Sequence, residues 1–382
     1  MKEIRIGIFG GSRGRNYYGP FDAIEGARIV AIADKKPEVR EKLKEIVAED
    51  VVVCETWDEM LAVGLDAVIL ANYFHEHCKY AIMAMEAGID VISETTAAPT
   101  LGECLDLVEC VERTGRKYML AANCPKMPGP AELGSVYQSG VLGEVLYAEA
   151  EYCHPMSAEE SSGLAPEEFH WRKYLPGTYY NMHTLGVLMA ATKLLPRRVT
   201  AMDVKTKSCE ARKGVITNAV SAGIALYEME NGSVFRSTGW VKMRPAGKWF
   251  RLSCENGTIE TDRENQDRVL LRSKDQKSML YDPMDWQYTA EERKGGHGGA
   301  DTRICQQICD YLSGKDEEPI IDIYRGVALS LAAIYGHYSV LEGKTFDIPD
   351  MKDKTAREVL RGDYRTPFVD PGKEATLACN RG

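Results

Sequence analysis

Short apolar runs alternate with helix-like segments through the first third of the chain. The runs are rich in aliphatic and β-branched residues, and apolar residues recur every three or four positions in the stretches between them. The runs read IRIGIF, RIVAIAD, DAVILAN, DVISE and KYMLAAN, the last ending at Asn123. Because strands and helices that alternate in this way form parallel sheets, residues 1–123 are predicted to be a doubly wound Rossmann domain.

The pattern changes after residue 123. The runs become longer, apolar and polar residues alternate along them, and Asn-Gly pairs interrupt them at Asn231-Gly232 and Asn256-Gly257. Asn-Gly between alternating runs is a strong hairpin signal, because the tight turn needs positive φ. Residues 124–350 are therefore expected to form an α+β domain with an open, mostly antiparallel sheet. Helices are expected over 184–195 and 323–343, and a C-terminal extension, 351–382, is expected to pack back on the body.

The predicted fold class is thus α/β, an N-terminal Rossmann domain followed by a C-terminal α+β domain. An open sheet leaves one face uncovered. A homodimer or homotetramer that stacks the sheets of two copies would cover this face, so we expect a homo-oligomer.

Composition and charge narrow the classes of partner. The 382 residues include 44% hydrophobic and 27% charged residues, a composition typical of a folded globular protein. Lys and Arg total 47 against 57 Asp and Glu, a net charge of −10, and no basic run could follow a phosphate backbone. Nucleic-acid and membrane partners are therefore not expected, and the strand pattern at the N-terminus favours a cytoplasmic location.

Metal and disulfide sites are not expected either. Eleven cysteines are scattered without a C-x-x-C pair, and the histidines show no H-x-x-x-H spacing. Zinc and redox sites usually have closely spaced ligands of this kind. The cysteines are interpreted as small buried hydrophobic residues in a reducing compartment.

The first predicted strand runs into the glycine-rich sequence GIFGGSRGRNYYG. Backbone amides and a helix N-terminus would meet a pyrophosphate there. The candidate cofactor contacts in this loop are Gly10, Gly11, Ser12, Arg13 and Gly14. The spacing departs from a strict G-x-G-x-x-G, which makes the loop alone weak evidence.

Asp34 ends the second predicted strand. An acidic residue at this point accepts the adenosine ribose hydroxyls and repels a 2′-phosphate, so NAD is favoured over NADP. The neighbouring Lys35 and Lys36 leave NADP as an alternative cofactor. The alternative role of Asp34 is to cap the helix that follows.

Residues 66–109, DAVILANYFHEHCKYAIMAMEAGIDVISETTAAPTLGECLDLVE, closely resemble the core motif of the Gfo/Idh/MocA oxidoreductases, as does LGEVLYAEAEY in the second domain. The matching positions are Asn72, His75, His77, Gly88 and Glu94. The resemblance implies a dinucleotide cofactor contacted by Asn72, His75, Glu94 and Asn123. His75 alternatively caps the next helix, and His77 is expected to face solvent or to cap a helix.

Two catalytic groups of the family's dehydrogenases are missing. Their Glu-Lys-Pro motif carries a lysine beside the nicotinamide, but this chain has Thr95 at that place and Thr96 in place of proline. Threonine cannot act as a base at neutral pH. Their Asp-x-x-x-His motif is represented here by Tyr179 and His183, so only the histidine is kept.

One branch of the family fits better. The sequences ETTAAPTLGECLDLVE, YYNMHTLG and GGHGGAD resemble those of NAD-dependent glycoside hydrolases with this fold, typified by bacterial α-N-acetylgalactosaminidases. The resemblance implies transient oxidation at sugar carbon 3, elimination of the aglycone, water addition and return of the hydride, so that NAD is recycled. It also implies catalytic roles for Tyr180, His183 and His297.

The residue types suit this chemistry. Tyr180 and His183 stand three apart on a helix expected to begin near Thr178, so both project from one face. An imidazole with a pKa near ~6.5 can take a proton from a sugar hydroxyl. His297 lies between two glycine pairs in KGGHGGAD, where main chain can pass close to a ligand. The alternative for His297 is a loop residue ahead of a helix that Asp301 caps.

Four further residues are expected to contact the substrate, with core packing as the alternative for the aromatic ones. These residues are His154, Trp171, Arg172 and Tyr179, and His170 stands beside the second and third of them.

Three functions stay open for a small carbohydrate or glycoside substrate. An NAD-dependent glycosidase is favoured. A net sugar or polyol dehydrogenase would use Lys126 or Lys173 in place of the missing lysine. A non-catalytic sugar or dinucleotide sensor would share only the fold.

Overall fold

The computed structural model describes residues 3–154, 163, 165–205, 220–240, 246–275, 278–284, 288–290, 292, 296, 298–316, 318–369 and 372–378. It divides into two compact units. Unit 1 comprises Met1–Pro99, Glu103–Lys126 and Thr289–Gly326, and unit 2 comprises Thr100–Gly102, Met127–Tyr288 and Val327–Gly382. Among the described residues, no helix has both the length and the apolar character needed to cross a lipid bilayer.

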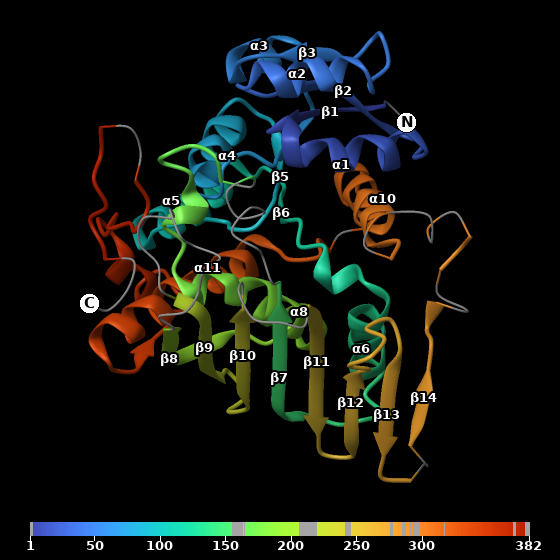
Figure 1. Ribbon diagram of the computed structural model, residues 1–382, viewed down its shortest axis with the longest axis vertical. Coiled ribbons are helices and arrows are strands. Elements are labelled where there is room, and N and C mark those ends of the chain that lie inside the picture. The colour runs from blue at the N-terminus through green and yellow to red at the C-terminus, as the bar shows by residue number, and fades with distance from the viewer. Residues whose placement is uncertain are drawn as a thin grey trace. The chain divides into compact units, whose positions relative to one another are not determined.

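Unit 1 contains a parallel six-stranded sheet in the order β3-β2-β1-β4-β5-β6 (Figure 1). The strands are β1 (Ile4–Phe9), β2 (Ala27–Ala33), β3 (Val52–Cys54), β4 (Ala67–Leu70), β5 (Asp90–Ser93) and β6 (Tyr118–Leu120). Apolar side chains such as Ile8 and Ile69 are fully buried, as expected for a sheet covered on both faces. The predicted Rossmann fold is confirmed. The short edge strand β3 was not predicted, because three residues carry too little pattern.

The helices of unit 1 follow the strands in the expected alternation. They are α1 (Gly11–Asp22), α2 (Pro37–Lys44), α3 (Trp57–Ala62), α4 (His77–Glu86), α5 (Leu101–Thr114) and α10 (Ala300–Ser313), with α5 beginning in unit 2. A capping box starts α3, in which the Thr56 hydroxyl accepts from Glu59 N and the Glu59 carboxylate accepts from Thr56 N.

The late helix α10 differs from the predicted division, which placed residues 289–326 in the second domain. In the structure these residues belong to unit 1. The thiol of Cys305 donates to the carbonyl of Tyr17 on α1, and the Lys117 ammonium donates to the carbonyl of Tyr311 at 2.7 Å. The local spacing of residues does not indicate when a late segment packs on an earlier domain. The position of α10 in unit 1 could therefore not be predicted from the sequence.

Unit 2 contains a nine-stranded sheet in the order β14-β13-β12-β11-β7-β10-β9-β8-β15. The strands are β7 (Val145–Cys153), β8 (Pro196–Lys205), β9 (Val220–Met229), β10 (Val234–Trp240), β11 (Gly247–Cys254), β12 (Gly257–Thr261), β13 (Val269–Ser273), β14 (Met279–Tyr281) and β15 (Phe346–Asp347). All described pairs are antiparallel except β7 with β10. The predicted open, mostly antiparallel sheet and its two Asn-Gly hairpins, β9–β10 and β11–β12, are confirmed.

Helices cover one face of this sheet. They are α6 (Pro128–Gln138), α8 (Met182–Thr192) and most of α11 (Ile323–Glu342), and Figure 1 shows α6 and α8 behind the strands. On β7 the buried Ala148 and Ala150 alternate with Glu149 and Glu151, whose side chains stand on the opposite face.

The helix predicted to begin near Thr178 begins later. Residues Gly177–Asn181 form a 3₁₀ helix, η4, and α8 starts at Met182. The Thr178 hydroxyl donates to the carbonyl of Ala333 on α11 at 3.0 Å, so it does not cap a helix. Because its hydroxyl is bonded to Ala333 of α11, Thr178 does not start the helix as predicted.

The C-terminal residues pack on α11 and η4. The His337 Nε2 lies 2.6 Å from the Ala378 carbonyl oxygen, and the Phe368 ring meets Tyr179 edge-on with centroids 5.8 Å apart. These contacts anchor the final described segment to the body of unit 2.

Candidate active site

The glycine loop of unit 1 brings main chain close to the ends of β1 and β4. Gly10 adopts the left-handed region, with φ of 100°, immediately before α1 begins at Gly11. A Cβ on Gly10 would overlap the backbone of Ala71 and Asn72, and a Cβ on Gly14 would overlap the Ile8 side chain. Only glycine fits these positions, which leaves the N-terminus of α1 open to an anionic ligand.

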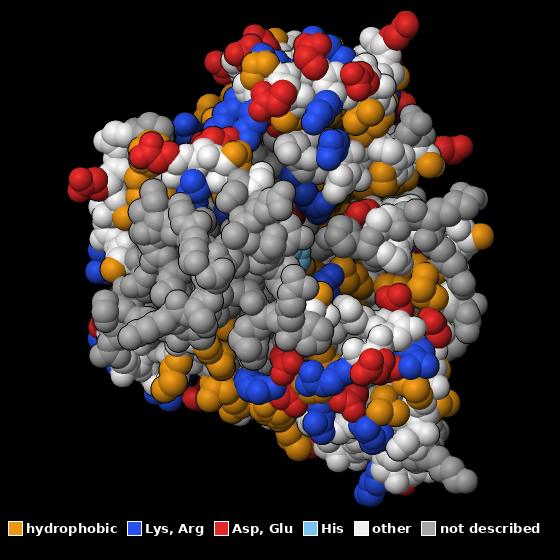
Figure 2. Space-filling view, viewed as in Figure 1, with side chains coloured by type: hydrophobic (Ala, Val, Ile, Leu, Met, Phe, Trp, Pro, Cys, Tyr) orange, Lys and Arg blue, Asp and Glu red, His pale blue; other side chains and the backbone are white. Residues whose placement is uncertain are grey.

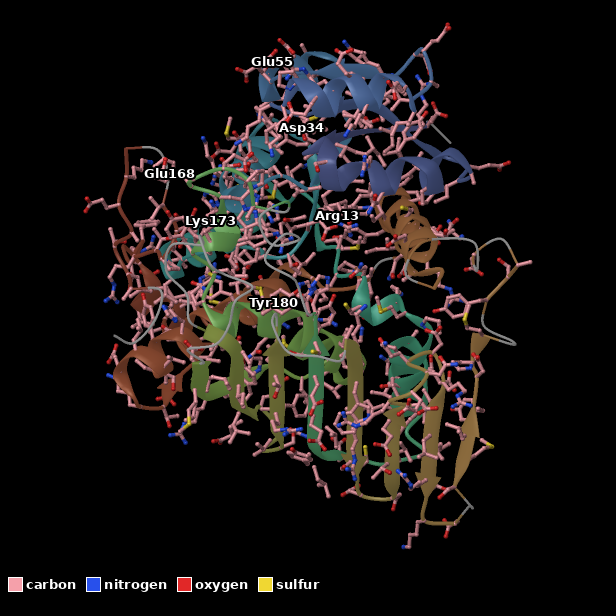
Figure 3. The ribbon with its side chains drawn as sticks, viewed as in Figure 1. Arg13, Asp34, Glu55, Glu168, Lys173 and Tyr180 are labelled. Atoms are coloured by element: carbon pink, nitrogen blue, oxygen red, sulfur yellow. The ribbon has the colours of Figure 1, made fainter. Side chains whose placement is uncertain are left out.

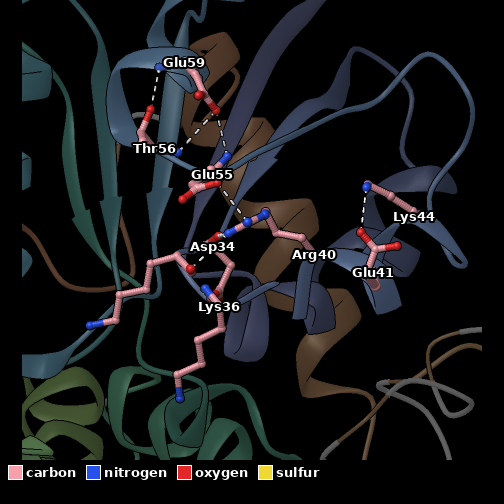
Figure 4. A network of polar contacts seen from close by, with 9 residues as sticks. Asp34, Lys36, Arg40, Glu41, Lys44, Glu55, Thr56 and Glu59 are labelled. Carbon is pink, nitrogen blue, oxygen red and sulfur yellow. Dashed lines mark hydrogen bonds and ion pairs between the residues drawn. The ribbon is translucent and has the colours of Figure 1, made fainter. Parts of the chain in front are cut away.

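Asp34 is fixed beside this loop. Its Oδ2 accepts from Ser12 N at 3.0 Å and its Oδ1 accepts from Lys36 N at 2.9 Å, while the side chain is largely buried. Arg40 donates to the Asp34 carbonyl and pairs with Glu55, as Figure 4 shows. A carboxylate held in one position by two amides is a ready acceptor for ribose hydroxyls.

The end of β4 offers a second polar group. Asn72 donates from Nδ2 to Glu76 at 3.2 Å, and its buried Oδ1 has no hydrogen-bond partner among the described residues. A buried acceptor without a donor costs free energy unless a ligand supplies one. This orphan oxygen, the glycine loop and Asp34 together fit a dinucleotide.

His75 and His77 have different surroundings. His75 lies in the 3₁₀ turn η1 (Phe74–Glu76), with its ring 6.2 Å from that of Tyr73. His77 is buried and is the first residue of α4, after the N-cap Glu76, so it neither faces solvent nor caps the helix as expected. Its Nδ1 lies 3.0 Å from the Thr96 carbonyl oxygen and its Nε2 lies 3.3 Å from that of Asn72, so it links the ends of β4 and β5. Burial lowers the pKa of His77, so the ring is neutral and donates to one of these carbonyls.

Arg13 and Glu94, two expected cofactor contacts, pair with each other. The Arg13 Nε donates to Glu94 Oε1 at 2.9 Å, and the Tyr17 hydroxyl donates to the same oxygen at 2.7 Å. The negative charge of Glu94 raises the pKa of Arg13, and Asp301 adds to this effect. Burial and Glu94 raise the pKa of Tyr17. The pair thus links α1 to the end of β5.

The glycine string before α10 has a local explanation. Gly298 and Gly299 adopt left-handed conformations, with φ of 68° and 91°, and a Cβ on Gly296 would overlap the carboxylate of Asp301. Asp301 lies in the first turn of α10. His297 falls outside the described residues. Its neighbours belong to unit 1, together with the cofactor loop.

Unit 2 gathers aromatic and imidazole rings at one end of its sheet. The Tyr152 ring lies 5.1 Å from His183, 5.5 Å from Tyr180 and 6.2 Å from His154, measured between centroids. Tyr180 and His183 are 5.0 Å apart. We call these four residues the ring cluster. Figure 3 shows Tyr180 at the end of the strands of unit 2, with Lys173 apart from it. His154 is exposed, His183 is partly buried and Tyr180 is 8% exposed.

Two glycines on adjacent strands allow η4, which carries Tyr180, to pack closely against the sheet. Gly223 of β9 and Gly239 of β10 are register partners, and Gly239 also pairs with Tyr152 of β7. A Cβ on Gly239 would lie 2.8 Å from Asn181 Oδ1 and 3.0 Å from the Tyr180 carbonyl carbon. The missing side chains let η4 rest on the strands, beside the Tyr152 ring.

A second aromatic group leads into η4. His170 stacks on Trp171 with centroids 5.7 Å apart, and its Nδ1 accepts from Arg172 N. The guanidinium carbon of Arg172 lies 4.3 Å from the Trp171 ring centre. Burial lowers the pKa of Arg172, and attraction by Tyr180 and Tyr152 partly offsets this. Trp171 and Arg172 therefore belong to the same region as the ring cluster.

Tyr179 does not belong to this site. Its side chain is 2% exposed and packs edge-on against His337 and Phe368, at centroid distances of 6.3 and 5.8 Å. This burial corrects the expectation that Tyr179 binds substrate. Neighbouring residues in a 3₁₀ turn point in different directions, so Tyr180 faces the ring cluster while Tyr179 faces α11.

Two residues of the site, Tyr152 and Lys248, were not predicted from the sequence. Tyr152 of β7 stands two positions before His154, which directly follows the strand, so the period-two spacing was an available signal. Lys248 of β11 is the register partner of Tyr152, and its Nζ lies 5.1 Å from the Tyr152 ring centre. No spacing in the sequence pairs Lys248 with β7. The expected contact Asn123 precedes the 3₁₀ turn η2 (Cys124–Lys126), which also contains Lys126.

Residues 4–122 match the family model described as an oxidoreductase family with an NAD-binding Rossmann fold. Residues 4–122 thus match the NAD-binding domain of the Gfo/Idh/MocA oxidoreductases. NAD is accordingly its cofactor.

The chain is also similar to proteins named glycosyl hydrolase family 109. It is 25% identical to one from Shewanella woodyi, covering 89% of this chain and 83% of the relative. It is 25% identical to one from Parabacteroides distasonis, covering 91% and 86%.

Solved structures share the fold. An Agrobacterium radiobacter oxidoreductase in complex with NAD⁺, L-tartaric acid and magnesium superposes with a TM-score of 0.73 at 16% identity, covering 91% of this chain and 98% of that chain. A levoglucosan dehydrogenase in complex with NADH superposes with a TM-score of 0.75 at 19% identity, covering 91% and 100%. Among the described residues no cluster of His, Cys, Asp or Glu has the form of a metal site.

Proposed function

We propose that the chain is an NAD-dependent glycosidase that cleaves glycosides by transient oxidation of the sugar. The observation that carries this proposal is the ring cluster of unit 2, in which two phenols and an imidazole meet within 5.5 Å between centroids. Thr95 replaces the lysine of the dehydrogenases, so proton transfer falls to these rings. The similarity to glycosyl hydrolase family 109 proteins supports the same conclusion.

The residues of unit 1 would hold the cofactor. Asp34 would accept the adenosine ribose hydroxyls, the amides of the loop Gly10–Gly14 would face the pyrophosphate, and Asn72 Oδ1 would accept one further hydrogen bond. His75, Glu94 and Asn123 complete the proposed set, with Arg13 acting through Glu94. Bound NAD supplies an acceptor for one hydride and the means to return it.

The ring cluster would move the protons. His183 takes the proton of the sugar hydroxyl that becomes a carbonyl, since a neutral imidazole is the strongest base of the cluster near pH 7. A neutral imidazole of the site then takes the now acidic proton from carbon 2, and the electron pair of that C–H bond forms a carbon 1–carbon 2 double bond as the aglycone leaves from carbon 1. Tyr180 and Tyr152 donate hydrogen bonds to the sugar oxygens, and His297 is proposed as a second imidazole for the leaving oxygen or the incoming water.

Sugar binding would use the flat groups beside the cluster. Trp171 and the Tyr152 ring offer apolar faces that pack on the C–H face of a sugar, and Arg172 and His154 offer donors. We propose a glycoside as the substrate for this reason.

The uncovered sheet face would pair with a second copy of the chain. Arg236, Glu149, Arg251 and Glu260 form a row of alternating charge across four strands, and Figure 2 shows such charges beside hydrophobic side chains. Leu226 and Met202 are 47% and 73% exposed on this face.

Light scattering coupled to size-exclusion chromatography tests this pairing of sheet faces. We expect the mass of a dimer or tetramer, and the mass of a monomer would contradict this part of the proposal.

Product analysis tests the proposed reaction. Aryl glycosides of several sugars are incubated with the NAD-loaded protein, and aglycone release is compared with absorbance of NADH. We expect aglycone release over many turnovers with no net NADH. Stoichiometric NADH from a free sugar, without aglycone release, would instead assign the chain as a dehydrogenase.

A further inference from the structure

Among the described residues of unit 2, two cations at the ring cluster have no carboxylate in hydrogen-bond contact. The Lys248 ammonium lies over the Tyr152 ring, and its hydrogen bond goes to the sulfur of Met127 at 3.4 Å, a weak acceptor. The Arg172 guanidinium lies over Trp171 and is attracted by the hydroxyls of Tyr180 and Tyr152. Within the described part of the chain, neither cation forms an ion pair.

Several arginines of unit 2 pair directly with carboxylates. Arg236 meets Glu149 at 2.7 Å and Arg197 meets Asp350 at 3.0 Å. Arg172 is partly buried, and the loss of water lowers its pKa, with no carboxylate among the described residues to offset this. A cation that loses water without gaining an anion is unfavourable in the unliganded protein. The arrangement becomes favourable when a ligand brings the negative charge.

One carboxylate does act on Lys248 from a distance. Burial and the nearby Asp282 raise the pKa of Asp267, and the positive charge of Lys248 offsets part of this rise. The two side chains form no ion pair within 4 Å among the described contacts. Lys248 is therefore only partly compensated, and its ammonium stays available to a ligand at the cluster.

We infer that the sugar recognised at the ring cluster carries a permanent anionic group, a carboxylate, phosphate or sulfate, which Arg172 and Lys248 bind. This inference rests on the proposed function, because it names the substrate class of the same site. The rings of Tyr152 and Trp171 pack on the sugar while the two cations hold its oxyanion. A guanidinium matches carboxylate and phosphate oxygens with two parallel hydrogen bonds.

Direct binding to the NAD-loaded protein tests the inference without requiring turnover. Calorimetry compares D-glucuronate, D-galacturonate, D-glucose 6-phosphate and D-glucose 6-sulfate with D-glucose and D-galactose. At least one anionic sugar should bind roughly 10- to 100-fold more tightly than its neutral counterpart, the range of one or two charge-assisted hydrogen bonds. The preference should shrink as salt is raised. A uronate preference identifies a carboxylate, and a preference for the 6-substituted sugars identifies phosphate or sulfate.

Two variants locate the effect. Arg172→Gln and Lys248→Gln should each reduce the ratio of anionic-sugar to neutral-sugar affinity about 10-fold. The matched controls are Arg365→Gln and Lys344→Gln, whose cations lie over Tyr338 and Phe346 away from the cluster and should change nothing. Thermal unfolding identifies a variant that fails to fold, and in that case Arg172→Lys and Lys248→Arg, which keep the charge, must retain the preference.

The results separate this inference from the proposed reaction. Equal or absent binding of anionic and neutral sugars overturns the inference, even if neutral glycosides are hydrolysed. A large loss of turnover on a neutral glycoside in both variants, with binding unchanged, also overturns it, because the cations would then serve an anion formed during the reaction. An anionic preference in a protein that hydrolyses nothing supports the inference and contradicts the glycosidase.

Discussion

The rings of Tyr152 and His183 stack with their centroids 5.1 Å apart and their planes inclined by 25°. Tyr152 is carried by β7 and His183 by α8, so the sheet supplies a flat surface against which the imidazole is held. The Tyr180 ring meets the imidazole edge-on from η4. Two aromatic contacts hold the direction of the imidazole, which suits a residue that must alternately take and release a proton.

Removing the imidazole should impair turnover far more than binding. We expect His183→Gln and Tyr180→Phe to lower kcat roughly 10²- to 10⁴-fold and about 10-fold or more, respectively, because a positioned acid or base contributes on this scale. Substrate affinity, measured by calorimetry on the same proteins, should change only a few-fold. Tyr137→Phe on α6 is the matched control, and equal losses in all three variants would indicate general destabilisation.

The close contact at Gly239 should be sensitive to one methyl group. An alanine at this position would bring Cβ to 3.0 Å from the Tyr180 carbonyl carbon and would push η4 away from the sheet. Gly239→Ala should therefore lose about 1–3 kcal/mol in the free energy of unfolding and most of its kcat. A Cβ on Gly247 would have no neighbour within 4 Å among the described residues, so Gly247→Ala serves as the control. Wild-type activity in Gly239→Ala would show that the position of Tyr180 does not matter.

Asp34 should govern the choice of cofactor. Asp34→Asn removes the negative charge while keeping the size, so the affinity for NAD should fall about 10-fold and the discrimination against NADP should shrink. Fluorescence titration of both cofactors measures this. Glu55→Gln alters the same network at an exposed carboxylate that pairs with Arg40, and it should bind NAD normally. Unchanged NAD affinity in Asp34→Asn would place the ribose elsewhere.

His337 should make stability depend on pH. Burial lowers the pKa of His337 to about 4, below the ~6.5 of an unfolded chain, so the unfolded state binds the proton first as the pH falls. The stability that depends on neutral His337 is present in full above pH ~6.5 and is lost progressively down to pH ~4, by roughly 3 kcal/mol. The difference in free energy of unfolding between wild type and His337→Gln should therefore vary across this window and stay constant above pH 7. A constant difference across the whole range would contradict the assignment.

Much of the fold could be predicted from the sequence because its pattern is local. The runs that became β1, β2, β4, β5 and β6 are buried on both faces and hence almost wholly apolar, and the Asn-Gly pairs mark the β9–β10 and β11–β12 hairpins. The edge strand β3 and the return of α10 to unit 1 lack such a pattern. Both depend on contacts between segments far apart in the chain.

The candidate site was predictable only in part. Two signals are local: the spacing of Tyr180 and His183, and the position of Asp34 at a strand end. In the structure the Tyr180 and His183 rings are in contact, and Asp34 accepts a hydrogen bond from the glycine loop. Tyr179 was assigned to the substrate because it replaces an acidic residue, but its burial against Phe368 depends on the C-terminal segment. Lys248 reaches Tyr152 only through the register of β11 with β7, which no single stretch of sequence encodes.

Deuterium incorporation at carbon 2 tests the central claim most directly. An aryl glycoside that the protein cleaves is turned over in deuterated water, and the released sugar is examined by NMR. The proposed reaction predicts one deuterium at carbon 2 of each product molecule, no deuterium at carbon 3 and no accumulation of NADH. Cleavage that leaves hydrogen at carbon 2 would contradict the account, because the bond to the aglycone would then break without the oxidation and proton loss assigned to this site.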